Sequence, residues 1–323
     1  GYEAVRVAKV FHGGTSRDGK RIPYNDPSRW TELFGAGRSK PRQPLKGPGI
    51  DMIREARERG IKPTGNTNFK YGPSGLTENE EKSAAITDKA MEVIAQKREK
   101  PLFLALGYSE PHLALSAPKK YHDMYPPEQM EIPKNPGSKK NGMPMDESVL
   151  DRGNPHTLEQ WRDAISSHYA CVSLLDYNIG RLLDYLKESG RDKNTIVVLW
   201  SDHGFMLGEH YKWRKGGLID EAVMVAFMVK APGITQAGSV CKRPMESVDI
   251  LPTFCQLCDM PIPEHAEGVG MLELLKNPEM QWRKGAISCR HDPSKKTIRT
   301  ERYRYIEYGG PEKVELFDHS KPE

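Results

Sequence analysis

Apolar side chains follow two different periods along this chain of 323 residues. Residues 4–11 alternate between apolar and polar positions, which is typical of a strand with one buried face. Residues 101–108 and 195–200 are short, nearly continuous apolar runs of the kind that form buried strands, and a further strand is predicted in residues 223–233.

Longer segments have the 3.6-residue period of amphipathic helices. In residues 77–99, Thr77 and Glu80 make a capping box, and apolar side chains continue at helical spacing. In residues 158–189, apolar side chains recur every three or four positions until Gly190, which is typical of a helix end. A shorter amphipathic helix is predicted at residues 247–258.

The pattern changes after Pro261. Three short alternating segments follow, which suit an antiparallel sheet: residues 285–290, 297–308 and 313–318. Because helices and strands alternate before this point, we predict a layered α/β domain over residues 1–260 and a smaller, β-rich subdomain over residues 261–323. Residues 13–76 and 111–155 are rich in Gly, Pro and charged side chains and are predicted to be long loops.

Composition limits the kinds of partner. The net charge of +4 is too small to suggest a nucleic-acid-binding protein, and no apolar run approaches the roughly 20 residues that a membrane span needs. Residues 1–62 nevertheless hold 14 Lys and Arg against 7 Asp and Glu. This excess has two interpretations: a solvated basic surface, or a surface that attracts an acidic substrate or polysaccharide.

The five cysteines form no disulfide framework, and their odd number leaves at least one unpaired. Cys255 and Cys258 make a C-x-x-C pair on the predicted helix at residues 247–258, without the second pair that a zinc site needs. Core packing is the simpler interpretation of this pair, and a redox or metal role is the alternative.

Candidate chemistry gathers where predicted strands end. Lys9 and His12 follow the first strand, His112 follows the run at 101–108, and Asp202 with His203 follows the run at 195–200. In open α/β sheets, ligands bind beyond the carboxyl ends of the strands, where loops converge. We therefore expect these side chains to lie close together around a ligand.

The residue types indicate an anion and a metal. Asp202 offers a hard oxygen donor and His203 a nitrogen donor, and Gly204 lets the backbone turn close beside them. The pair is half of a metal site, or alternatively a turn in which Asp202 caps the following segment. Lys215 follows on a glycine-flanked loop. Since lysines supply point charges and histidine can protonate a leaving oxygen, the set suits a sulfate or phosphate ester.

The sequence resembles the sulfatases of the alkaline-phosphatase superfamily, and within them the iduronate-2-sulfatase-like branch. The resemblance extends over nearly the whole chain, in stretches that occur in order: AKVFHGG (8–14), FLALGYSEPH (103–112), HYACVSLLDYNIGRLLDYL (168–186), SDHGFMLGEHYKWRK (201–215), VDILPTF (248–254), IRTERYRYIEY (298–308) and ELFDHSKPE (315–323). KVFH, where most sulfatases have Lys-Trp-His, and Asp-His in place of the commoner Asp-Asn point to this branch.

The resemblance implies a fold and an activity. The fold is an alkaline-phosphatase-like layered sheet with helices on both faces, plus a small C-terminal antiparallel β subdomain. The activity is hydrolysis of sulfuric esters, with a sulfated sugar or glycosaminoglycan, such as an iduronate-like 2-sulfate, as substrate. Members of this family are mostly exported, so the resemblance also implies a periplasmic, extracellular or lysosomal location.

The resemblance further implies roles for matching residues. Lys9 is similar to the lysine that contacts both nucleophile and sulfate, and His12 to the histidine that steadies the nucleophile's hydroxyl. His112 resembles the sulfate-binding histidine, a candidate for protonating the leaving alcohol, and Lys215 resembles the second sulfate-binding lysine.

The same resemblance implies a metal site. Asp202 and His203 match two ligands of an ion that is Ca²⁺ in family members, although a nitrogen ligand is unusual for so hard a cation. Two consecutive aspartates complete the site in sulfatases, and no Asp-Asp pair occurs in this sequence.

The family nucleophile is also missing from the sequence. Sulfatases attack sulfur with the hydrate of a formylglycine, which a maturation enzyme makes from the Cys or Ser of a C-x-P-S-R motif. Cys289 does not match, because its proline lies four positions on instead of two. We expect the motif and the aspartates upstream of residue 4, in a chain truncated at both ends, so that this fragment alone is inactive. Met224 and Ala226 also depart from the family pattern.

Two alternatives stay open. A two-metal phosphatase or phosphodiesterase of the same superfamily also uses Asp-His-Gly, but it needs an Asp followed four residues later by His, and Asp176 has Gly180 at that position. A non-catalytic protein that binds sulfated polysaccharide would keep the anion pocket without a nucleophile.

Overall fold

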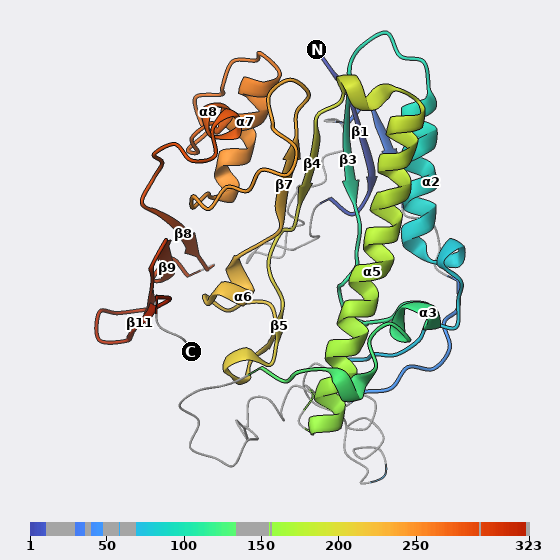
Figure 1. The fold of residues 1–323 in the computed structure, drawn as a ribbon, viewed down its shortest axis with the longest axis vertical. Coiled ribbons are helices and arrows are strands. Elements are labelled where there is room, and N and C mark those ends of the chain that lie inside the picture. The colour runs from blue at the N-terminus through green and yellow to red at the C-terminus, as the bar shows by residue number, and fades with distance from the viewer. Residues whose placement is uncertain are drawn as a thin grey trace, which may run out of the picture. The chain divides into compact units, whose positions relative to one another are not determined.

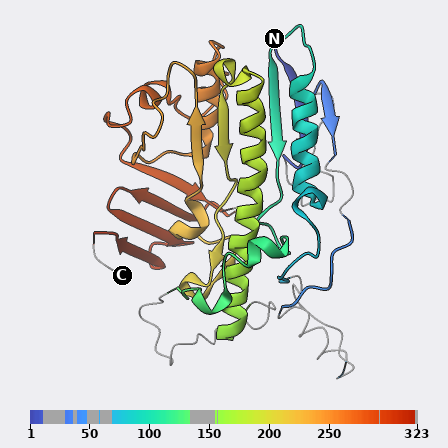
Figure 2. The same ribbon diagram turned by 45° about the vertical axis from the view of Figure 1, so that its right-hand side comes forward.

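The computed structural model describes residues 1–10, 30–35, 40–47, 58, 69–133, 155, 157–290 and 292–320. The chain forms two compact units, Gly1–Gly190 and Arg191–Glu323, each with its own helices and sheet (Figures 1 and 2). The subdomain boundary expected near residue 260 stays a prediction.

The sheet of the first unit has three parallel strands. β1 (Glu3–Ala8) lies between β2 (Glu32–Phe34) and β3 (Leu102–Gly107). Ala8 is level with Gly107, so the two neighbouring strands end at the same edge of the sheet. The strands predicted at residues 4–11 and 101–108 are therefore confirmed.

Two long helices run beside this sheet (Figure 1). The Thr77–Glu80 capping box is present at the short 3-10 turn Glu78–Glu80, and α2 (Lys82–Ala95) follows it. α5 (Leu158–Glu188) begins where the Thr157 hydroxyl accepts a hydrogen bond from the Gln160 amide. The shorter elements are α3 (Lys119–His122) and the 3-10 turn Pro127–Gln129.

Packing in the first unit follows the predicted periods. Val5 and Val7, on one face of β1, are fully buried with Ile86 and Val93 of α2. α2 and α5 are joined by an ion pair between Asp88 and Arg181. The alternation of β1 thus reflects one face covered by a helix.

The second unit contains two strand pairs and a four-stranded sheet. β4 (Val197–Trp200) pairs antiparallel with β7 (Phe227–Lys230), and β5 (Met206–Leu207) pairs with β6 (Trp213–Arg214). The antiparallel C-terminal sheet has the order β11-β10-β9-β8, formed by β8 (Gly285–Cys289), β9 (Lys295–Thr300), β10 (Tyr303–Tyr308) and β11 (Val314–Asp318). This sheet confirms the small β-rich part predicted after Pro261.

The helices of the second unit are short. They are the 3-10 turns Arg191–Asn194, Glu209–Tyr211 and Ser247–Asp249 and the helices α6 (Asp220–Val223), α7 (Ile250–Leu257) and α8 (Leu272–Lys276). α6 shortens the strand predicted at residues 223–233, because Val223 belongs to its helical turn and β7 begins only at Phe227. The mixed α/β class is confirmed.

Two further features can be compared with the sequence: helices long enough to span a membrane, and the state of the cysteines. Within them, every helix is too short or too polar to span a bilayer. All five cysteines are free, and Cys255 is buried in α7. Burial of Cys255 agrees with core packing as the simpler role of the C-x-x-C pair.

Candidate active site

The predicted site residues divide between the two units. Lys9 and His112 belong to the first unit, and Asp202, His203 and Lys215 belong to the second. His12 lies outside the described residues. That these side chains form one site stays a prediction, and the geometry within each unit is as follows.

Lys9 leaves the sheet at a constrained point. Ala8, the last residue of β1, has a φ of 64°, in the left-handed region that non-glycine residues rarely adopt. The backbone of Lys9 then passes directly over Gly107, the last residue of β3, which has no room for a side chain. Such strain persists where the surrounding structure holds it in place, and it often marks functional sites. The exposed Lys9 is therefore presented from a defined backbone position.

His112 is held by its own neighbours. Its amide donates a hydrogen bond to the Ser109 carbonyl, and its ring Nδ1 lies 2.7 Å from the Leu113 carbonyl oxygen. A carbonyl can only accept, so Nδ1 carries the proton, and Nε2 is the ring atom left to contact a ligand. Because His112 follows β3 and Lys9 follows β1, both lie beyond the same edge of the parallel sheet.

Asp202 and His203 form a tight turn after β4. The Ser201 hydroxyl donates to the His203 carbonyl, and Nδ1 of His203 lies 2.8 Å from the Gly204 carbonyl oxygen. This contact assigns the proton to Nδ1 and leaves the Nε2 lone pair for a ligand. Nε2 of His203 lies 3.6 Å from Oδ1 of Asp202. Two donors of one ion, each about 2.1–2.4 Å from it, have a separation of this size.

Glycine is required at the centre of this turn. The Gly204 amide donates to the Ala222 carbonyl of α6 at 2.9 Å. A Cβ atom on Gly204 would lie 2.0 Å from the Glu221 carbonyl oxygen. The turn is thus pressed against α6.

Lys215 follows a short hairpin made by β5 and β6. Arg214 has a φ of 72° and Gly216 a φ of 102°, so the backbone on both sides of Lys215 is left-handed. At the other end of the hairpin, the Glu209 carboxylate accepts a hydrogen bond from the Leu207 amide. Burial raises the pKa of Glu209. The side chain of Lys215 itself is exposed.

Asp202 and His203 have the ligand atoms that could form part of a metal site. Among the described residues, no group of three or more His, Cys, Asp or Glu side chains is placed to hold an ion. Asp202 and His203 supply one oxygen and one nitrogen donor, with Asp202 largely exposed and open to a ligand. That they form half of a metal site stays a prediction.

The contacts that hold these residues in place could not be predicted from the sequence. Gly107 and Gly204 are needed for close backbone approach, but a glycine at a strand end has many possible causes. Arg290, next to the Cys289 set aside above, lies 3.4 Å from the position of a Cβ on Gly216. Nothing in the sequence links these two segments.

Comparison with known proteins places the chain in a family. The family described as Sulfatase matches residues 36–260, more than half of the chain. The chain belongs to the sulfatase family. A second family, described as N-sulphoglucosamine sulphohydrolase, C-terminal, matches residues 208–323 of this sulfatase.

Two curated relatives illustrate the range of similarity. A sulfatase from Formosa agariphila is 27% identical over 330 aligned residues, which cover 95% of this chain and 60% of the relative. Iduronate 2-sulfatase from Mus musculus is 25% identical over 305 residues, covering 81% of this chain and 53% of the relative. The chain therefore spans little more than half the length of these relatives.

Solved structures agree on the fold. A phosphonate monoester hydrolase from Silicibacter pomeroyi matches 99% of this chain and 72% of its own, with a TM-score of 0.73 at 20% identity. A protein in complex with its substrate, D-glucosamine-2-N,6-O-disulfate, matches 74% of this chain and 63% of its own, with a TM-score of 0.60 at 21% identity. At these identities the likeness concerns the fold alone.

Proposed function

We propose that the protein is a sulfuric ester hydrolase that acts on a sulfated sugar. The observation that carries this proposal is the turn after β4, in a chain of the sulfatase family. There, Nδ1 of His203 is tied to the Gly204 carbonyl, and Nε2 and Asp202 are left 3.6 Å apart as donors. An imidazole with one nitrogen tied to a carbonyl and the other near a carboxylate supports a metal pair at this turn.

We propose that Asp202 and His203 hold a divalent ion, with Ca²⁺ as the ion expected from the family. Once bound, the ion would neutralise negative charge on a sulfate group and on the nucleophile's oxygen that attacks the sulfur. The two residues themselves orient the donors: the Gly204 carbonyl fixes the His203 tautomer, and Asp202 contributes the negative charge.

The remaining residues have proposed roles around the ester. Lys9 and Lys215 supply positive charge to a sulfate group that is itself negative, and His12 steadies the hydroxyl of the nucleophile. His112 keeps one proton on Nδ1, bound to the Leu113 carbonyl, so in the imidazolium form the second proton is on Nε2, which would deliver it to the leaving alcohol and keep the Nδ1 proton. The strained backbone before Lys9 supports a fixed position for that lysine.

The nucleophile is proposed to be a formylglycine, produced by a maturation enzyme from a Cys or Ser outside the sequence given. No C-x-P-S-R motif occurs in these 323 residues. Covalent catalysis needs such a group, so the proposal concerns the protein with its natural flanking sequence.

The finer proposal concerns the substrate. An iduronate-like 2-sulfate on a glycosaminoglycan, or a related algal polymer, agrees with the similarity to iduronate 2-sulfatase and with the basic composition of residues 1–62. Because sulfatases of this kind are mostly exported, the proposal includes a periplasmic, extracellular or lysosomal location.

The experiment is an assay of the protein with its natural flanking sequence, after mass spectrometry has confirmed formylglycine. The substrates are an aryl sulfate, an iduronate-2-sulfate disaccharide and a glucosamine-6-sulfate. His203→Gln should abolish turnover, and His265→Gln, at an exposed histidine of the same unit, should not. No turnover of any sulfate ester by the wild type would contradict the proposal, and it would favour the polysaccharide-binding alternative if the sugars still bind.

A second candidate is hydrolysis of phosphonate or phosphate esters, favoured by the fold shared with the phosphonate monoester hydrolase. Against it, Gly180 stands where a two-metal enzyme would place His after Asp176, and both residues lie within α5. The same assay with an aryl phosphonate monoester decides between the two functions. A kcat/KM larger for the phosphonate than for the sulfate esters would favour this second candidate.

A further inference from the structure

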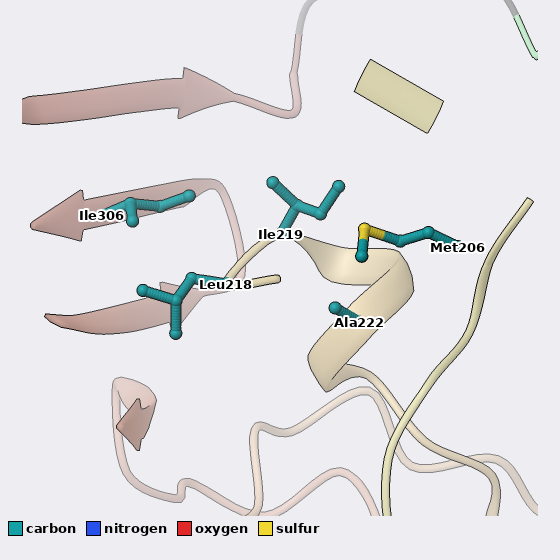
Figure 3. Close-up of a cluster of buried hydrophobic side chains, with 5 residues drawn as sticks. All are labelled: Met206, Leu218, Ile219, Ala222 and Ile306. Atoms are coloured by element: carbon teal, nitrogen blue, oxygen red, sulfur yellow. The ribbon is translucent and has the colours of Figure 1, made fainter. Parts of the chain in front are cut away.

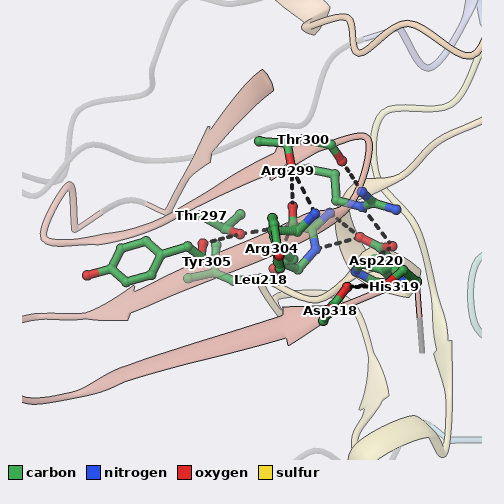
Figure 4. A network of polar contacts seen from close by, with 11 residues as sticks. Leu218, Asp220, Thr297, Arg299, Thr300, Arg304, Tyr305, Asp318 and His319 are labelled. Carbon is green, nitrogen blue, oxygen red and sulfur yellow. Dashed lines mark hydrogen bonds and ion pairs between the residues drawn. The ribbon is translucent and has the colours of Figure 1, made fainter. Parts of the chain in front are cut away.

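Asp220, the first residue of α6, is surrounded by basic side chains from the C-terminal sheet and the residue that follows it. Its Oδ2 lies 3.2 Å from Nε of Arg299 in β9 and 3.6 Å from Nε2 of His319, which follows β11. Its Oδ1 pairs with the guanidinium of Arg304 in β10. Figure 4 shows these side chains converging on one carboxylate. A single acidic residue thus ties α6 to three parts of the sheet.

Arg304 is the buried centre of this network, with 2% of its side chain exposed. Its Nη1 donates to the Leu218 carbonyl at 3.0 Å and to the Thr297 hydroxyl at 2.9 Å. The Thr297 hydroxyl in turn donates to the Tyr305 carbonyl. A buried guanidinium needs such partners, and removing Asp220 would leave its charge uncompensated.

An apolar cluster joins the same elements. Met206 of β5, Leu218 and Ile219 before α6, Ala222 of α6 and Ile306 of β10 are all buried together (Figure 3). The cluster therefore packs α6 against β5 as well as against β10 of the C-terminal sheet.

α6 depends on these contacts for its position. It has only four residues, Asp220–Val223, and a helix of one turn is not stable by itself in water. The contacts of Asp220 and of the apolar cluster must therefore hold it. Gly204 is pressed against Glu221, and its amide donates a hydrogen bond to the Ala222 carbonyl. The turn that carries Asp202 and His203 is therefore expected to move with α6.

We infer that Asp220 and Arg304 are positioning residues for the Asp202–His203 pair, acting through α6 and Gly204. The contacts run without a gap from Arg304 to Asp220, from α6 to Gly204, and from the Gly204 carbonyl to Nδ1 of His203. The C-terminal sheet thus sets the direction in which the His203 ring points. This inference rests on the proposed function, in which the pair binds an ion.

The test reads the turn directly, by hydrogen exchange of the Gly204 amide, which bonds to the Ala222 carbonyl. In Asp220→Asn, we expect this amide to exchange at least about tenfold faster, because local opening becomes easier. Arg304→Lys keeps the charge but loses the forked contacts, and a smaller increase is expected. The matched control is Arg302→Gln, which breaks the exposed Arg302–Asp318 pair of the same sheet and should leave Gly204 unchanged.

Exchange in the C-terminal sheet shows whether each variant is folded. Unchanged Gly204 exchange in both Asp220→Asn and Arg304→Lys, with the sheet intact, would overturn the inference. Equal acceleration in Arg302→Gln would overturn it too, because the effect would then be general loosening. If Asp220→Asn unfolds the sheet, Arg304→Lys alone decides. Unchanged Gly204 exchange in Arg304→Lys, with the sheet intact, would then overturn the inference.

A second measurement separates positioning from stability. In the protein with its natural flanking sequence, the Ca²⁺ concentration for half-maximal hydrolysis should rise about tenfold in Asp220→Asn, the size of effect known for residues that orient metal ligands. KM at saturating Ca²⁺ should change little. If the wild type hydrolyses no sulfate ester, the proposed function fails. If it does, and the variants keep normal exchange and Ca²⁺ requirement, the positioning inference alone fails.

Discussion

A methyl group on Gly107 would lie 1.9 Å from the carbonyl oxygen of Lys9, well inside the contact distance of two atoms. The ends of β1 and β3 are therefore interlocked, and the smallest possible residue at position 107 allows Lys9 to leave the sheet where it does.

Gly107→Ala should destabilise the first unit, because backbone rather than a movable side chain blocks the new Cβ. The expected loss is about 1–3 kcal/mol in the free energy of unfolding, measured by urea denaturation. Gly180→Ala is the control, since nothing lies within 4 Å of its Cβ position in α5. There we expect a gain of about 0.5–1 kcal/mol, as for glycine in a helix interior. Equal effects of the two substitutions would contradict the interlock.

Acid should destabilise the first unit through His168. Burial lowers the pKa of this imidazole to about 4, against about 6.5 in an unfolded chain. Between these values the unfolded state binds more protons, so the free energy of unfolding falls as pH is lowered from about 6.5 towards 4, by at most about 3 kcal/mol. His122, whose pKa burial also lowers to about 4, acts in the same direction.

His168→Phe should flatten this part of the pH profile, because a ring remains but no longer titrates. The measurement is urea unfolding at pH 7, 6 and 5, compared with wild type and with His265→Gln, which removes an exposed histidine. A pH slope unchanged in His168→Phe would show that other groups cause it.

Two arginines of β10 and its preceding turn should differ sharply in their effect on stability. Arg304→Met leaves Asp220 without its buried partner and is expected to cost about 3–5 kcal/mol. Arg302→Gln breaks a pair at the surface, where solvent screens the charges, and should hardly change the melting temperature. Thermal unfolding monitored by calorimetry compares the two, and a similar loss in both would contradict the assigned burial.

Metal removal should reveal the role of Asp202. In the protein with its natural flanking sequence, chelation should stop sulfate ester hydrolysis, and Ca²⁺ should restore it. Asp202→Asn loses a charged ligand and should need at least about tenfold more Ca²⁺. Asp192→Asn, at an ion pair with Lys230 elsewhere in the same unit, should behave as wild type. Full activity of wild type in the presence of the chelator would exclude this role.

Much of the local structure could be predicted because it depends on neighbours in the sequence. The Thr77–Glu80 capping box and the helix α5 at 158–188 are confirmed, since caps and helical periods involve residues three or four positions apart. β7 was predicted too long, because the hydrophobic run from Val223 does not show that Asp220–Val223 closes into a helical turn. Tertiary contacts through Asp220 and Ala222 decide that.

The sequence by itself determined the residue types at the ends of β1, β3 and β4, and hence the chemistry expected there. It also determined the family, because motifs spaced along one chain are compared without any structure. Only the tertiary structure decided how Nδ1 of His203 is occupied and that Arg304 supports α6 from 84 positions beyond Asp220. The Asp220–Arg304 contact depends on how distant segments pack, and a buried charge pair leaves no period in the sequence that could predict it. The His203 contact joins neighbouring residues, but the sequence does not show which way the backbone turns there.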